Sequence, residues 1–147
     1  MMLLLHSGQN RYVIDNKYVV RIFPHVFLKK LQGAPSYIAG LMYWEGKGTP
    51  VLDFCELIEQ RKPAHSYNTR IILINDQSQT YCLGILAEKV SDILPLEQKQ
   101  FFDEDLYMEQ SPFLDGIFHD AEGIIQRIDV EELFKFLSSK GSLWKCR

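Results

Sequence analysis

The sequence lacks an excess of basic charge and lacks long apolar stretches. Its 147 residues include 16 Lys and Arg against 19 Asp and Glu, for a net charge of −3. Proteins that neutralise many phosphates need the opposite balance, so we expect no nucleic-acid partner. The apolar start, Met1–His6, is short and polar residues follow it at once, which predicts a first strand and not a signal peptide or membrane span. We therefore expect no direct membrane insertion.

Motifs for metal binding and catalysis are also missing. The three cysteines are odd in number, far apart and without a CxxC pair, which suggests neither a zinc site nor a disulfide framework. The four histidines are scattered, without HxxxH or HExxH spacing. No Walker loop, GxGxxG turn or nucleophile elbow is present. The sequence predicts no catalytic residues, no metal site and no cofactor, and so a protein that is not an enzyme.

What the sequence does contain is a series of short apolar runs separated by turn residues. A hydrophobic fraction of 46% over 147 residues fits one globular domain. Short, closely spaced runs favour an all-β barrel or sandwich. The segments expected as strands are Leu3–Leu5, Arg11–Ile14, Tyr18–Phe23, Tyr37–Trp44, Thr49–Phe54, Thr69–Ile74, Thr80–Ala87, Glu88–Leu94, Phe113–Phe118 and Gly123–Ile128. Short helices are expected over Phe54–Glu59, capped by Asp53, and over Val130–Leu137, capped by Asp129.

Polar segments suggest how the chain is divided. The stretch 61–68 is polar and contains Pro63, and we expect it to mark the division between two intertwined halves of a single domain over residues 1–137. The mixed, charged stretch 96–110 predicts no clear element. The end of the chain, residues 138–147, is expected to be a flexible tail.

Four blocks of sequence follow one another in a specific order and spacing. The longest, Gln32–Phe54, reads QGAPSYIAGLMYWEGKGTPVLDF and combines a Gly-Ala-Pro turn, an apolar run, a Glu-Gly-Lys-Gly turn and a Pro-Val-Leu-Asp-Phe strand. The others cover residues 11–22, 83–94 and 116–134. Taken together, the four blocks resemble the CheW-like family, the coupling proteins of bacterial chemotaxis arrays.

The resemblance implies both a fold and a function. The fold would be all-β with short helices, built from two small five-stranded SH3-like β-barrel subdomains packed together and a C-terminal helix. The function would be that of a non-enzymatic, cytoplasmic scaffold that couples chemoreceptors to a chemotaxis histidine kinase. The implied partners are the kinase regulatory domain and the cytoplasmic hairpin tip of the receptor, with self-association in array rings.

The resemblance also carries a set of candidate protein-binding residues to this chain. They are Val19, Arg21, Ile22, Tyr43, Trp44, Glu45 and Gly46. Val19 and Ile22 would lie on a receptor-facing strand, and Trp44 would be a partner anchor. Glu45 stands where the family usually has Arg, and Arg21 stands where it often has an acidic residue. If these two face each other on neighbouring strands, they form an ion pair of reversed polarity, which would change the choice of partner.

These assignments have alternatives. Glu45 also fits a solvated turn residue, and Trp44 also fits a core position. The aromatic residues Tyr37, Tyr43 and Trp44 fit a second function, a β-barrel ligand- or oligonucleotide-binding module, although basic residues near them are sparse.

Overall fold

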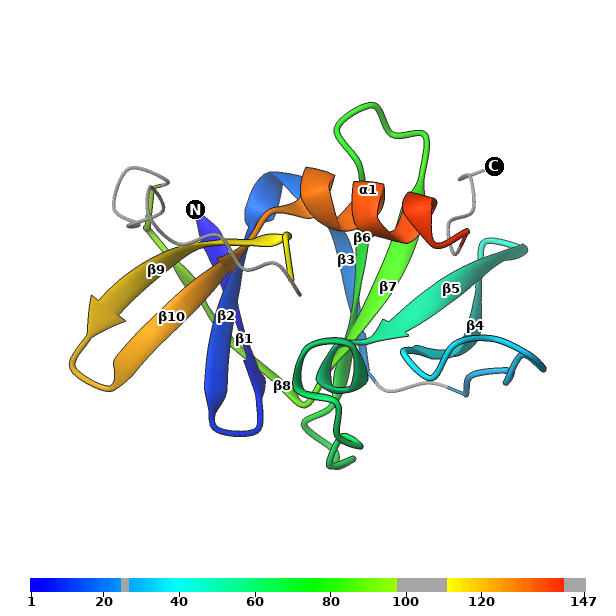
Figure 1. The fold of residues 1–147 in the computed structure, drawn as a ribbon, viewed down its shortest axis with the longest axis horizontal. Helices are drawn as coiled ribbons and strands as arrows, with labels where there is room; N and C mark the ends of the chain where they lie inside the picture. The colour runs from blue at the N-terminus through cyan, green and yellow to red at the C-terminus, as the bar shows by residue number, and fades with distance from the viewer. Residues whose placement is uncertain (25–26, 98–110, 142–147) are drawn as a thin grey trace.

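The computed structural model describes residues 1–24, 27–97 and 111–141 (Figure 1). The strands in these ranges are β1 (Met2–Ser7), β2 (Asn10–Asp15), β3 (Val19–Pro24), β4 (Ile38–Trp44), β5 (Lys47–Asp53), β6 (Arg70–Asn75), β7 (Cys82–Ala87), β8 (Lys89–Leu94), β9 (Leu114–Asp120) and β10 (Gly123–Ile128). The helical elements are the 3-10 turn η1 (Asn16–Tyr18), the π-helical turn η2 (Cys55–Glu59) and the α-helix α1 (Val130–Ser139). The expected strands and helices are confirmed, with ends shifted by at most two residues.

The described strands form two five-stranded sheets. The first sheet has the order β8-β1-β2-β10-β9, and the second sheet has the order β3-β6-β7-β5-β4. Each sheet contains one parallel pair, β2 with β10 and β5 with β7, and its other pairs are antiparallel. The expected all-β class, with two five-stranded halves and a C-terminal helix, is confirmed.

The chain passes between the two sheets after β2 and again after β7. Residues 61–68, expected at the division, instead lie between β5 and β6, which both belong to the second sheet. The composition of a polar loop does not show which strands the loop joins. The predicted division at residues 61–68 is therefore wrong. The two halves are interleaved along the chain, and no single cut separates them.

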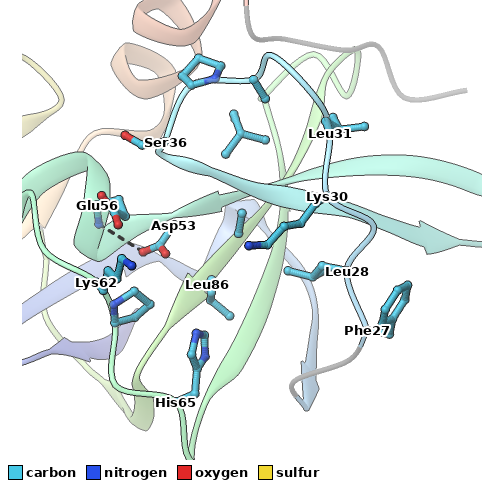
Figure 2. A pocket seen from close by; sticks show the side chains of 15 residues that line it. Phe27, Leu28, Lys30, Leu31, Ser36, Asp53, Glu56, Lys62, His65 and Leu86 are labelled. Atoms are coloured by element: carbon cyan, nitrogen blue, oxygen red, sulfur yellow. Dashed lines mark hydrogen bonds between the residues drawn. The ribbon is translucent and has the colours of Figure 1, made fainter.

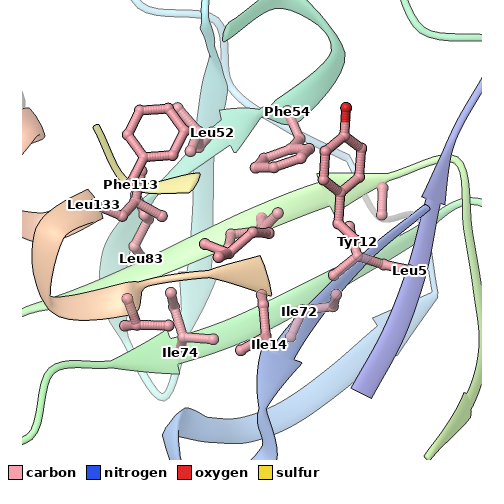
Figure 3. Packing of buried hydrophobic residues seen from close by; sticks show 14 of the residues in the cluster. Leu5, Tyr12, Ile14, Leu52, Phe54, Ile72, Ile74, Leu83, Phe113 and Leu133 are labelled. Atoms are coloured by element: carbon pink, nitrogen blue, oxygen red, sulfur yellow. The ribbon is translucent and has the colours of Figure 1, made fainter. Parts of the chain in front are cut away.

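One shared apolar core joins both sheets and α1 (Figure 3). Leu5 and Ile14 come from the first sheet, and Leu52 and Ile72 come from the second. Leu133 of α1 belongs to the same cluster, and all five side chains are fully buried. The two sheets and α1 therefore bury apolar side chains in the same core.

Strand β6 shows why some strands have an unbroken apolar sequence. Ile72 and Ile74 pack in the shared core, whereas Ile71 and Leu73 pack with Leu86 in a separate cluster of the second sheet. Successive side chains of a strand point to opposite faces. A strand that is buried on both faces therefore has no polar alternate positions.

Helix α1 begins at a side-chain cap and packs through one face. The Asp129 carboxylate accepts the backbone N–H of Glu132 at 3.1 Å, as an N-cap does. The buried residues recur at helical spacing: Val130, Leu133, Phe134 and Leu137. Figure 1 shows α1 crossing from the end of β10 toward the second sheet, which agrees with its place in the shared core. Over the ranges described, no helix has the length and apolar character needed to span a bilayer.

Candidate protein-interaction surface

Strand β3 lies at one edge of the second sheet. A bulge between Val19 and Arg21 interrupts its pairing with β6 and the alternation of its side chains. Val20 is 50% exposed and Ile22 is 39% exposed, whereas Val19 is partly buried against the shared core. The strand therefore presents Val20 and Ile22 to solvent. The sequence does not identify Val20 as an exposed residue, because a run of apolar residues does not show where a bulge will form.

Arg21 lies over two aromatic rings. Its guanidinium carbon is 5.0 Å from the centre of the Trp44 ring and 5.4 Å from the centre of the Phe23 ring, within cation–π range. The two rings contact each other edge to face, with centres 5.0 Å apart. Because β3 and β4 are the opposite edges of the second sheet, these contacts show that the sheet curls until its edges approach. The structure thus brings Arg21 and Trp44 together and adds Phe23, which the sequence analysis did not select.

The turn between β4 and β5 carries Glu45 and Gly46 at its tip. Trp44 pairs with Lys47, so the two residues between them form a two-residue hairpin turn. Both have positive φ, 49° at Glu45 and 76° at Gly46, as a type I′ turn requires. This conformation suits glycine but strains a glutamate by about 1–2 kcal/mol. The neighbouring Tyr43 is 69% exposed, so the turn presents a strained acidic residue beside an exposed aromatic ring.

The structure does not pair Arg21 with Glu45. Strands β3 and β4 are not hydrogen-bonded neighbours, and no ion pair joins these two side chains in the described chain. Arg21 stacks on aromatic rings instead, because the curling of the sheet brings Trp44 over it. The expectation of an ion pair with reversed polarity is wrong. Arg21 and Glu45 lie on the surface without contacting each other.

Glu88 lies where the chain passes from β7 to β8, between the two sheets. Its carboxylate accepts the backbone N–H groups of Gly8 at 2.6 Å and Ala64 at 2.8 Å. It also accepts hydrogen bonds from the Arg61 guanidinium and the Cys55 thiol. These donors come from the β1–β2 turn, from η2 and from the loop after η2. Glu88 therefore ties a turn of the first sheet to a loop of the second.

The surroundings of Glu88 set the charges of this polar cluster. Burial alone would raise the pKa of Glu88, but the hydrogen bonds from Arg61 and Ala64 outweigh it and lower the pKa to about 2. Arg61 also bonds Glu59 at 2.8 Å and so bridges two carboxylates. Burial raises the pKa of the Cys55 thiol to about 12. A thiol that stays protonated is a poor nucleophile. The hydrogen-bonded cluster around Glu88 therefore serves to connect the two sheets.

The described surface offers exposed side chains for contacts to proteins. Among the described residues, no three His, Cys, Asp or Glu side chains lie close enough to hold a metal ion. Cys55 is free and buried. Exposed apolar and aromatic side chains beside unpaired charges are typical of protein–protein contact surfaces.

Two interleaved five-stranded sheets around one core, with an exposed apolar edge and a charged turn beside it, define the chain as an all-β interaction domain. The chain belongs to the CheW-like domain family, whose model matches residues 1–137. The resemblance noted in the sequence is confirmed.

Two known proteins show how far the similarity extends. The chain is 25% identical over 133 residues to the chemotaxis protein CheW of Klebsiella aerogenes, covering 89% of this chain and 79% of the relative. Its structure matches that of the scaffolding protein TtCheW from Thermoanaerobacter tengcongensis with a TM-score of 0.79 and 21% identity, covering 90% of this chain and 86% of that one. The second match establishes a common fold.

Proposed function

We propose that this chain is a non-enzymatic, cytoplasmic adaptor of a bacterial chemosensory array, which couples chemoreceptors to a chemotaxis histidine kinase. The family match over residues 1–137 carries the proposal. The names of the two relatives, a chemotaxis protein and a scaffolding protein, support it. The partners would be the kinase regulatory domain, the receptor hairpin tip and neighbouring copies in array rings.

The exposed part of β3 is the proposed receptor contact. A receptor tip is a pair of amphipathic helices, and such helices dock on exposed apolar side chains. Val20 and Ile22 supply these side chains. We expect Ile22→Asp to weaken binding to a purified receptor hairpin by about tenfold or more, as loss of an apolar contact residue does. The matched control is Ile124→Asp on β10, where the side chain is 46% exposed. Equal weakening by both variants would rule out β3 as the contact.

The β4–β5 turn is the proposed kinase contact. Glu45 projects a negative charge where the family usually has a positive one, so its partner surface should be locally basic. We expect Glu45→Arg to weaken binding to the regulatory domain of the cognate kinase by about fivefold or more, since like charges then face each other. Glu122→Arg reverses an exposed charge on a turn of the first sheet and should leave binding unchanged. Unchanged binding by Glu45→Arg would show that Glu45 is only a solvated turn residue.

A titration with single-stranded oligonucleotide at low salt separates this proposal from the oligonucleotide-binding alternative. Arg21, Tyr43 and Trp44 place one basic group among aromatic rings. Binding along a phosphate backbone needs several such groups, so we expect no saturable quenching of tryptophan fluorescence. Salt-sensitive quenching that Arg21→Gln abolishes would favour the alternative.

A further inference from the structure

The second sheet has a cavity of about 750 Å³ that the proposed partner surface does not use (Figure 2). Its walls come from the connection between β3 and β4, the start of β4, the end of β5, η2, the loop that follows η2, and β7. None of the candidate protein-binding residues lines it. Small-molecule sites have volumes of about 300–1,000 Å³, so this cavity has the size of a ligand site.

Gly40 allows the β3–β4 connection to form one wall of this cavity. Lys29 pairs with Leu41 of β4 through two backbone hydrogen bonds, of 2.9 and 2.8 Å. A Cβ at position 40 would lie 2.7 Å from the Lys29 carbonyl oxygen, so a side chain there would push the connection away. Leu28 and Lys30 line the cavity, whereas Lys29 between them does not.

The interior of the cavity combines apolar surface with charges of both signs. Its larger apolar side chains are Phe27, Leu28, Leu31, Ile38 and Leu86, and its charged and titratable side chains are Lys30, Asp53, Glu56, Lys62 and His65. In Figure 2, Lys30 reaches in from the β3–β4 connection toward the side that carries Asp53 and Glu56. Asp53 is 7% exposed and accepts the backbone N–H of Glu56 at 3.2 Å, which holds its carboxylate in place. Within the described chain, neither Lys30 nor Glu56 belongs to an ion pair.

We propose that this cavity binds a small zwitterion with an apolar side chain, either a hydrophobic α-amino acid or a short peptide of such residues. The ligand carboxylate pairs with Lys30, and its ammonium group pairs with the carboxylates of Glu56 and Asp53. The apolar side chain packs against Ile38 and Leu86. Lys30 and Glu56 belong to no ion pair within the described chain, and a zwitterion supplies a charged partner to each of them at once. A ligand with a single charge would meet a like charge at one end.

Matched ligands test the two ends of the site separately. Binding to the purified full chain is measured by calorimetry for leucine and for the dipeptide leucyl-leucine, which distinguishes an amino-acid site from a peptide site. N-acetyl-leucine lacks the ammonium group, and leucine amide lacks the carboxylate. We expect saturable binding of at least one zwitterion and a loss of about fivefold or more for each blocked analogue, since each lacks one charge-assisted contact. Absence of saturable binding by both zwitterions, or equal binding of the analogues, would overturn the proposal.

Matched variants then locate the site. Lys30→Gln should weaken the binding of leucine by about fivefold, because the variant lacks the lysine that pairs with the ligand carboxylate. Leucine should then bind no more tightly than leucine amide. Glu56→Gln should reduce the advantage of leucine over N-acetyl-leucine, because only the Asp53 carboxylate is then left to pair with the ammonium group. Lys29→Gln changes the neighbouring lysine, whose side chain does not line the cavity, and should leave all affinities unchanged. Equal effects of the Lys29 and Lys30 variants would show non-specific attraction and refute the site. The test involves neither kinase nor receptor, so its outcome is independent of the adaptor proposal.

Discussion

Gly8 is needed at its position for two independent reasons. Its φ of 61° lies in the left-handed region, which costs other residues about 1–2 kcal/mol. A Cβ at this position would also collide with the Arg61 guanidinium, which could move away only by weakening its hydrogen bond to Glu88. We expect Gly8→Ala to lower the free energy of unfolding by about 2–3 kcal/mol, measured by urea denaturation.

Gly33→Ala is the control for backbone strain alone. Its φ is 79°, and no atom lies within 4 Å of the added Cβ. This variant should cost only the strain of about 1–2 kcal/mol. If Gly8→Ala costs no more than Gly33→Ala, the contact between Arg61 and Glu88 does not contribute to stability.

Arg21 should be energetically coupled to Trp44 but not to Glu45. Arg21 lies over the Trp44 ring and forms no ion pair with Glu45 in the described chain. A double-mutant cycle between Arg21→Met and Trp44→Leu should show a coupling of about 0.5–1 kcal/mol in the free energy of unfolding. The same cycle between Arg21→Met and Glu45→Gln should give a value near zero. A larger coupling to Glu45 would restore the reversed ion pair as the reason for the two charges.

At the scale of elements, α1 depends on its N-terminal cap. Asp129→Ala leaves the backbone N–H of Glu132 without its partner and should lower the free energy of unfolding by about 0.5–2 kcal/mol. Thermal and urea denaturation measure the loss. Lys135→Ala removes an exposed pair with Glu132, with the two side chains 74% and 42% exposed, and should change stability by at most about 0.5 kcal/mol. A similar loss in both variants would mean that α1 is held by its apolar face alone.

The elements that the sequence predicted are those with local signals. Asp129, followed by apolar residues at helical spacing, predicts α1, and the Glu-Gly-Lys-Gly turn predicts the hairpin whose tip carries Glu45. Strand pairing depends on residues far apart, so the parallel pair of β2 with β10 has no local signal. The bulge that exposes Val20 is a property of the pairing with β6, and it was missed for the same reason. The contact of Phe23 with Arg21 and Trp44 likewise requires a curled sheet that no single segment encodes.

At the scale of the whole molecule, Glu88 connects the two sheets outside their shared core. Glu88→Gln keeps the shape of the side chain but removes the charge that the donors Gly8, Ala64 and Arg61 share. We expect this variant to lower the free energy of unfolding by about 1–3 kcal/mol at neutral pH, as loss of hydrogen bonds to a charged group does. Faster hydrogen exchange at the Gly8 and Ala64 amides would trace the loss to the junction between the sheets.

The pH dependence of stability follows from the same carboxylate. The pKa of Glu88 is lowered from 4.5 to about 2 in the folded chain, so the folded state binds the proton less readily than the unfolded state. Its stabilising contribution is therefore complete above about pH 4.5 and is lost as the pH falls toward 2. The wild-type free energy of unfolding should decline through this window more steeply than that of Glu88→Gln, so that the two curves converge near its acid end. Urea denaturation at a series of pH values measures both curves. Curves that stay parallel would show that the charge of Glu88 does not help to hold the two sheets together.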